Sequence, residues 1–576
     1  MIKKYISIAL SLSVAVLTLC TPIDVKAATQ SLTVDCDNVI RSVTHCASGS
    51  LYGINETTPA DISTLVTPLN PNVFTNPARA GSEYQQPTGA AIDVAERLYG
   101  NSSGEVMIRL ADICPNWPYS FPGMSTWLDE VETVITDKLN SSADNFYGYE
   151  IWNEPVYTWD ESTNGSFYTL WENTYDLIRL LDPNEKIIGP SDGYYDHDRM
   201  YNFLAYCVSN DCVPDIICWH ELSSNGSGSY ISDFVNNYND YRSIEDSLGI
   251  SDRPISINEY CDIDHTKEGC PGSAARYIAK YERYSIDSAC ISWWWTAYPG
   301  RLGSLLGTDY QKGAGWWFYK WYGDMSGNMV VTVPSNEEST YVDGFACVDS
   351  SEKYISVMFG GDNDGDINIT LNDLPSWIGS TATVRVEAID WVSKDSVSTG
   401  PYTISAANYD VNGSSITVSL SGCNSTSGYR LLVLPGVSSS QTRYEAENAI
   451  ISNANTFYSA NASNNYYVGQ IDYDDSTTPV YSYVDFLVCA PSSGTYTLSI
   501  RYANGSGATS TQGLAYNNGA WQTISYEETD GWAQFATKNV QVSLNEGINV
   551  IRLAKGSPYF EGGTYYAEID YIEISQ

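Results

Sequence analysis

The chain is long, strongly acidic and rich in aromatic residues. It has 576 residues, and 69 Asp and Glu against 29 Lys and Arg give a formal net charge of −40. This length predicts about three or four domains of roughly 150 residues, or fewer if one is a large α/β barrel. The acidity disfavours nucleic acid and anionic membranes as partners, because this field repels both. The 16 Trp, 45 Tyr and 13 Phe suit sugars, whose C–H faces stack on aromatic rings.

The first residues predict export from the cell. Lys3 and Lys4 precede an apolar run over 6–19, and Ala27 offers a small residue for cleavage. This pattern is typical of a secretory signal peptide, here residues 1–27, and the run is too short for a stable membrane span. We therefore expect a secreted, extracellular protein without a membrane partner.

Twelve cysteines follow the signal peptide. In an oxidising compartment they predict disulfides, although the connectivity cannot be deduced from sequence. Short loops offer three candidate pairs: Cys36–Cys46, Cys207–Cys212 and Cys261–Cys270. No CxxC or HExxH spacing occurs and the four His are scattered, so we expect no zinc site.

Residues 50–325 alternate short apolar segments with longer mixed ones. Eight strands with crossover helices over this length predict a (β/α)₈ TIM barrel. The expected strands are 51–54, 72–75, 106–110, 147–152, 186–189, 216–220, 255–259 and 291–295, and the clearest helices are 90–98, 125–139, 167–181 and 274–285.

The remaining regions are rich in expected strands. Residues 326–436 show short alternating segments, which predict an antiparallel β-sandwich side domain. Residues 28–49 also form strands in this interpretation and join that sandwich. A polar linker over 437–443 then leads to a third unit, 444–576, of the length of a jelly-roll β-sandwich.

Two glutamates end strands of the expected barrel. Glu154 stands in the segment Trp-Asn-Glu-Pro over 152–155 at the end of strand four, and Glu259 ends strand seven. The active sites of such barrels lie at the carboxyl ends of the strands, where strands four and seven face each other. Two carboxylates across one bond are what hydrolysis of a glycoside requires: one donates a proton and the other acts at the anomeric carbon.

The Asn-Glu-Pro segment and the strand-seven glutamate resemble the retaining glycosidases of clan A. With a barrel and a sandwich built from both flanks, the chain looks most like glycoside hydrolase family 39, which contains β-xylosidases, α-L-iduronidases and α-L-arabinofuranosidases. The resemblance implies that Glu154 is the general acid/base and Glu259 the nucleophile. It also implies that Asn153 binds the 2-hydroxyl of the sugar, and that catalysis needs no cofactor.

Further substrate-binding candidates lie along the same rim. By resemblance to the clan, Arg79 would hydrogen-bond the nucleophile and a strand-eight tryptophan, Trp293 or Trp295, would floor the sugar subsite. His220 resembles the strand-six position that contacts the nucleophile, and a structural histidine is the alternative. The candidates after strand three are Asp112, Asn116 and Trp117.

The third unit resembles carbohydrate-binding modules of families 6 and 35. The resemblance rests on its opening segment Tyr-Glu-Ala-Glu-Asn over 444–448 and on its closing segment over 568–574. In those modules the matching acids bind a structural calcium, which here implies Glu445, Glu447 and Asp570. Tyr466, Trp532 and Tyr565 lie in loop-like stretches and are candidate sugar platforms or core residues.

These features predict a secreted retaining glycosidase that acts on arabinose- or xylose-containing plant cell-wall polysaccharide. Within enzymes, an α-L-arabinofuranosidase, a β-xylosidase and an endo-acting glycanase stay open. A catalytically silent carbohydrate-binding or adhesin protein is the alternative outside enzymes. The acidic loop 362–366 contains a glycine, but it comes one place too early for a calcium-binding EF-hand, and the loop has no duplicate. We therefore expect no dockerin-type scaffold partner.

Overall fold

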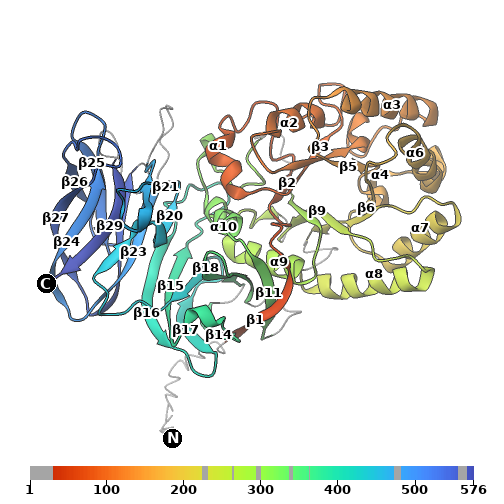
Figure 1. The fold of residues 1–576 in the computed structure, drawn as a ribbon. Helices are drawn as coiled ribbons and strands as arrows, with labels where there is room; N and C mark the ends of the chain where they lie inside the picture. Colours follow the sequence, from red (N-terminus) through yellow and green to blue (C-terminus); the bar gives the residue numbers. More distant parts are fainter. Residues whose placement is uncertain are drawn as a thin grey trace, which may run out of the picture.

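The chain folds into a barrel, a central β-sheet domain and a C-terminal β-sandwich (Figure 1). The computed structural model describes residues 30–222, 231–262, 265–292, 300–335, 342–361, 364–471, 482–555 and 567–576. Within these ranges, no helix has both the length and the apolar character needed to cross a membrane. The predicted combination of a TIM barrel with two further β-rich units is confirmed.

The barrel is closed by parallel strands. In the described part of the chain eight of them form the ring, and β10 closes it by pairing with both β2 and β9. A ninth, two-residue strand, β8, pairs only with β9. The strands are β2 (Gly49–Leu51), β3 (Val73–Pro77), β4 (Glu105–Arg109), β5 (Phe146–Glu150), β6 (Ile187–Asp192), β7 (Ile216–Trp219), β8 (Glu221–Leu222), β9 (Ile255–Cys261) and β10 (Ser288–Ile291).

Helices cover the outside of the barrel. In α6 the buried residues recur every three or four positions, Leu170 then Thr174 then Ile178, which is the stripe a helix needs to pack on a sheet. Ser166 caps this helix, since its side chain accepts a hydrogen bond from the Tyr168 amide. The helices are α1 (Ile62–Leu65), α2 (Ala91–Leu98), α3 (Met124–Asn140), α4 (Pro155–Thr158), α5 (Glu161–Asn164), α6 (Phe167–Leu181), α7 (His197–Ser209), α8 (Phe234–Leu248), α9 (Pro271–Arg283) and α10 (Ala314–Gly323).

The central domain is one long sheet folded over on itself. Its strands follow the order β16-β15-β18-β13-β12-β11-β1-β14-β17, and all neighbours are antiparallel except β1 and β14. Val384 of β15 and Val418 of β17, from opposite ends of the sheet, share one core. The strands are β1 (Gln30–Ser42), β11 (Asn328–Pro334), β12 (Asp343–Asp349), β13 (Tyr354–Gly360), β14 (Gly365–Asn372), β15 (Thr381–Ile389), β16 (Tyr402–Asp410), β17 (Ile416–Cys423) and β18 (Gly428–Pro435).

The C-terminal unit packs two antiparallel sheets around its own core. One sheet has the order β21-β22-β29-β24-β27, with β19 paired to β29, and the other has the order β20-β23-β28-β25-β26. The strands are β19 (Arg443–Glu445), β20 (Ile450–Ser452), β21 (Asn455–Tyr458), β22 (Tyr466–Gly469), β23 (Ser482–Ala490), β24 (Gly494–Ala503), β25 (Ser510–Tyr516), β26 (Gln522–Tyr526), β27 (Ala536–Leu544), β28 (Gly547–Lys555) and β29 (Glu568–Ser575).

A buried ion network joins this unit to the central domain. Asp485 on β23 is fully buried and pairs with Arg385 of β15 at 2.6 Å and with Arg552 of β28 at 2.7 Å. Arg385 also pairs with Glu387 of its own strand at 2.9 Å. Charges removed from water are stable only when they are paired in this way. The segment that connects the two units is short and polar, yet the units are fixed to each other by these charges.

The cysteines do not form the expected disulfides. All twelve that the structure describes are buried free thiols, including the members of the three candidate pairs. Buried cysteine packs as a small apolar residue, so most of these positions serve the cores. The disulfide prediction is therefore wrong for the structure as it stands.

We expect Asp485→Ala to lower the free energy of unfolding by about 3–5 kcal/mol, because it removes the buried carboxylate that Arg385 and Arg552 share. Urea denaturation followed by tryptophan fluorescence measures this change. The matched control is Glu573→Ala, which breaks the exposed pair of Arg443 and Glu573 and should cost about 0–1 kcal/mol. Equal losses in the two variants would contradict a structural role for the buried network.

Candidate functional site

The two strand-end glutamates meet at the carboxyl end of the barrel. Glu259 lies within β9, whereas Glu154 lies four residues beyond the end of β5, at the start of α4. Glu154 has a left-handed backbone with φ of 50°, and Pro155 begins the helix after it. One carboxylate oxygen of each glutamate and a ring nitrogen of His220 all lie within 4.8 Å of one another. The site therefore holds two carboxylates on opposite sides of one small space.

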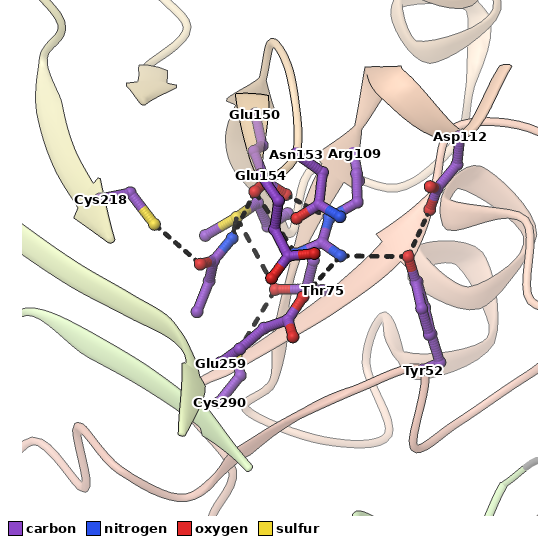
Figure 2. A network of polar contacts seen from close by, with 12 residues as sticks. Tyr52, Thr75, Arg109, Asp112, Glu150, Asn153, Glu154, Cys218, Glu259 and Cys290 are labelled. Atoms are coloured by element: carbon purple, nitrogen blue, oxygen red, sulfur yellow. Dashed lines mark hydrogen bonds and ion pairs between the residues drawn. The ribbon is translucent and has the colours of Figure 1, made fainter. Parts of the chain in front are cut away.

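A buried arginine holds Glu259 in place. The Arg109 guanidinium donates to Glu259 Oε1 at 2.8 Å and to Glu150 Oε2 at 2.7 Å, and its side chain is 1% exposed (Figure 2). Asn258 donates to the other oxygen of Glu150. Glu150 is thus the counter-ion of Arg109, and one side chain ties together the ends of β4, β5 and β9.

The prediction that Arg79 contacts the nucleophile is wrong. Arg79 lies beyond the end of β3 and pairs at 2.6 Å with Asp137 on helix α3, outside the barrel. Arg109 makes the expected contact instead, because it is the last residue of β4 and its side chain points into the barrel. The sequence signal was available: Arg109 is a charge at the end of an apolar strand at the catalytic rim.

His220 bridges the two carboxylates. Its Nδ1 lies 3.2 Å from Glu154 Oε1 and 3.7 Å from Glu259 Oε2, and the ring is fully buried. Burial lowers the pKa of His220, but the charges of Glu259 and Glu154 outweigh it and raise the pKa above its ordinary value. Its Nε2 has no hydrogen-bond partner among the described residues.

Asn153 is the third polar group at this space. It donates to the Tyr119 hydroxyl at 3.2 Å, and its Oδ1 is buried without a partner in the described part of the chain. Buried polar atoms are normally paired, so Asn153 Oδ1 and His220 Nε2 mark places where a ligand hydroxyl or water fits. Asn153 and His220 are both among the substrate-binding residues predicted from the sequence.

Asp112 holds two tyrosine hydroxyls beside the site. It accepts a hydrogen bond from Tyr52 at 2.6 Å, and Tyr52 in turn accepts one from Arg109 (Figure 2). It also accepts a hydrogen bond from Tyr119 at 2.8 Å. Burial raises the pKa of Asp112 to about 6, although Arg109 and the two hydroxyls oppose that rise. Asp112 therefore orients the groups around the glutamates, and sequence reasoning missed the two tyrosines that connect it to them.

The remaining rim candidates are more exposed or fall outside the described residues. Asn116 is exposed and donates to the Ser120 hydroxyl at 3.0 Å. Trp117 is 51% exposed. Trp293 and Trp295 lie outside the described residues. Trp117 can offer a sugar a ring face, whereas nothing directs Asn116 towards the glutamates.

Tyr157 lies near Glu154, and Tyr194 packs beside Tyr157. A Cβ added to Gly193 would lie 2.9 Å from Glu154 Oε1 and 2.5 Å from a ring carbon of Tyr157, so the backbone at Gly193 packs directly against both. The Tyr157 and Tyr194 rings have centroids 5.9 Å apart, and Tyr157 is 47% exposed. The glycine lets an aromatic pair lie next to this carboxylate.

The acids proposed for the C-terminal unit lie near one another. Ser463 contacts both Glu445, through its hydroxyl at 2.9 Å, and Asp570, through its amide at 2.9 Å, while Asn464 donates to Glu447. Glu445 and Glu447 each have one buried oxygen without a hydrogen-bond partner among the described residues. Arg501 pairs with Asp570.

The aromatic candidates of this unit differ in what the structure shows. Tyr466 is 44% exposed and packs edge-on against Tyr458, and Trp532 is 39% exposed. Both therefore present ring surface to solvent, as a sugar platform requires. Tyr565 lies outside the described residues.

Comparison with known proteins gives a family for part of the chain. Residues 138–250 match the profile "Glycosyl hydrolases family 39". A solved structure of N2152 from Neocallimastix frontalis is 53% identical, with a TM-score of 0.69, over 71% of this chain and 100% of that one.

Two curated relatives match most of this chain. A 3-O-β-L-arabinopyranosyl-α-L-arabinofuranosidase of Bifidobacterium pseudocatenulatum is 24% identical over 71% of this chain and 48% of its own length. A 3-O-α-D-galactosyl-α-L-arabinofuranosidase of Bifidobacterium longum subsp. longum is 25% identical over 73% of this chain and 42% of its own. The chain thus spans about half the length of the curated relatives it matches.

A family 35 carbohydrate-binding module from Clostridium thermocellum matches a smaller part. It is 31% identical over 23% of this chain and 95% of that chain, with a TM-score of 0.20.

The contacts of His220 predict a measurable dependence on the two glutamates. Glu259→Gln removes the negative charge that opposes burial, so we expect the pKa of His220 to fall. NMR titration of the ring resonances measures this, and with four His in the chain the signals are few. His197, whose pKa is raised by Asp240, is the internal control and should not move. An unchanged His220 in this variant would contradict the geometry described.

Proposed function

We propose that the whole protein, in which residues 138–250 match glycosyl hydrolases family 39, is a retaining O-glycosyl hydrolase. The observation that carries this proposal is the approach of Glu154 and Glu259, with oxygens within 4.8 Å. Retaining glycosidases hold their carboxyl groups about 5–5.5 Å apart, whereas inverting ones leave about 6.5–9.5 Å for a water molecule. The short separation supports direct attack by a carboxylate.

In the first step Glu259 is the nucleophile. Its Oε2 attacks the anomeric carbon while Arg109 holds Oε1, and the bond from that carbon to the leaving oxygen breaks. Protonated Glu154 gives its proton to the leaving oxygen as the bond breaks. The product of this step is a glycosyl ester on Glu259, and the leaving sugar departs with the proton.

In the second step water replaces the leaving group. Glu154, now ionised, takes a proton from the water, which attacks the anomeric carbon and releases Glu259. His220 Nδ1 lies near both carboxylates, so it can interact with whichever of the two is negatively charged. Asn153 Oδ1, which has no partner among the described residues, accepts a hydrogen bond from a sugar hydroxyl. Two inversions at one carbon retain the anomeric configuration, and the proton donor and nucleophile both come from the chain.

The leaving group lies on the side of Glu154, because Glu154 must reach its oxygen. The exposed Tyr157 ring, with Tyr194 beside it, is placed to stack on the sugar that leaves. This supports a sugar leaving group, as in an oligosaccharide or polysaccharide substrate.

Among substrates, an α-L-arabinofuranoside is favoured. Both curated relatives carry α-L-arabinofuranosidase in their names, at 24% and 25% identity to this chain. Arabinose-containing plant cell-wall polysaccharide, cleaved outside the cell after export through the signal peptide, is the natural target of such an activity. The net charge of −40 disfavours acidic sugars and leaves neutral glycans as the suitable class.

The C-terminal unit is a calcium-bound carbohydrate-binding module in this proposal. The unpartnered, buried oxygens of Glu445 and Glu447 suit a hard cation, which prefers carboxylate oxygen. Asp570 completes the set, although Arg501 already pairs with it. Calcium would hold together the two ends of the module, and Tyr466 and Trp532 would bind sugar.

We expect Glu154→Gln to lower kcat on an arabinose-containing oligosaccharide by about 10²–10⁴-fold, because it removes the proton donor. Glu259→Ala should reduce release of sugar to background. Aryl α-L-arabinofuranosides and β-D-xylosides identify the sugar, and proton NMR identifies the first product anomer. Glu161→Gln, on the exposed helix α5, is the control and should keep full activity.

Wild-type turnover by Glu259→Ala would eliminate the assignment of the nucleophile. An inverted first anomer would eliminate the retaining mechanism, and cleavage of polymers alone would favour an endo-acting glycanase. If the wild-type chain binds glycans but cleaves none, the silent binding protein is the correct interpretation.

We also expect calcium to raise the Tm of the full chain, and Glu447→Gln to abolish that rise by removing one ligand. Differential scanning calorimetry with calcium or with a chelator measures both. Glu546→Gln changes an exposed acid of the same unit and should leave the calcium effect intact. Identical melting with calcium and chelator would rule out a calcium site in this module.

A further inference from the structure

A second cluster of metal-ligating side chains lies just beyond the nucleophile strand. Cys261 is the last residue of β9, and His265 and Glu268 follow before helix α9 begins at Pro271. One ligand atom from each of the three lies within 4.8 Å of the other two. Cys261 and Glu268 are buried, at 4% and 3% exposure.

The contacts converge on one ring nitrogen. His265 Nδ1 lies 3.2 Å from Cys261 Sγ and 2.5 Å from Glu268 Oε1. A ring nitrogen carries either one proton or one lone pair, so it cannot form a full hydrogen bond to both atoms. A cation bonded to all three atoms satisfies each of them at once. We propose that Cys261, His265 and Glu268 bind a divalent metal ion of the zinc class.

The ligand types select this class of ion. Thiolate and imidazole are preferred by zinc and similar transition metals, whereas calcium and magnesium take oxygen ligands. One thiolate and one carboxylate also balance the two positive charges of the ion. Binding forms bonds from the ion to Cys261 Sγ, His265 Nδ1 and Glu268 Oε1, displaces water from the hydrated ion, and releases the Cys261 thiol proton to solvent.

The surroundings complete the site. The second oxygen of Glu268 accepts from the Ser304 hydroxyl at 3.0 Å and from Lys394 at 2.6 Å, which orients Oε1 towards His265. Such outer contacts fix carboxylate ligands around metals. Cys261 and Glu268 also line one cavity, which offers room for water as a fourth ligand.

The ion would act as a structural brace. Cys261 is two residues from Glu259, so a metal bond at Cys261 anchors the end of the strand that carries the nucleophile. This role is independent of the proposed glycosidase activity, because it concerns the order of the segment between β9 and α9.

The test uses the full chain, stripped of metal with a chelator and then saturated with calcium. Cobalt(II) serves as the spectroscopic probe and zinc as the competing ion. We expect one cobalt per chain with a thiolate-to-cobalt charge-transfer band, loss of that band on adding zinc, and a rise in Tm with zinc. Cys261→Ser should lose the band, and His265→Ala should weaken zinc binding at least tenfold.

Cys423→Ser is the matched control, because Cys423 is a buried thiol of the central domain. It should keep both the band and the zinc effect. Absence of the charge-transfer band in the wild-type chain would overturn the proposal. So would a thiol titration that finds Cys261 and Cys270 joined in a disulfide, or retention of the band in Cys261→Ser. None of these readouts depends on cleavage of a sugar.

Discussion

The buried guanidinium of Arg109 is the constraint on which the catalytic end of the barrel depends. It lies between Glu150 and Glu259 and is almost completely removed from water. A charge in such a place is stable only with partners, and the partners here come from two other strands. The same ion pairs that keep Arg109 buried therefore fix Glu259 relative to β4 and β5. Tyr52, which packs under the guanidinium and bonds to Asp112, extends this order to Asn153 through Tyr119.

Glu154 and Glu259, the two glutamates of the proposed mechanism, differ because their neighbours differ. Glu259 faces a permanent cation, whereas Glu154 faces a histidine and the close backbone of Gly193. The first environment suits a group that stays ionised until it forms a bond. The second suits a group that exchanges a proton with the leaving oxygen and then with water. His220 connects the two, since its ring nitrogen lies near both.

The sequence predicted the barrel and the two glutamates because both depend on local patterns. Alternation of apolar strands and amphipathic helices predicts the barrel, and a glutamate at the end of a strand can be recognised from a short sequence motif. Contacts between distant strands have no local motif, so the prediction fell on Arg79, although the position of Arg109 at the end of an apolar strand was a usable signal. The spacing of Cys261, His265 and Glu268 matches none of the common metal motifs, and the structure is what shows their ligand atoms within 4.8 Å of one another. The disulfide prediction failed because it rested on compartment and count, whereas the thiols are packed into cores.

The proposed mechanism requires that Glu259 forms a covalent bond to the sugar. An activated 2-deoxy-2-fluoro glycoside of the preferred sugar slows the second step, and mass spectrometry of the digested chain then locates the trapped sugar. We expect the chain to lose activity as it gains one sugar, and the label to lie on the peptide containing Glu259. A label on another residue, or turnover of natural substrate by a chain that never accumulates a label, would contradict it.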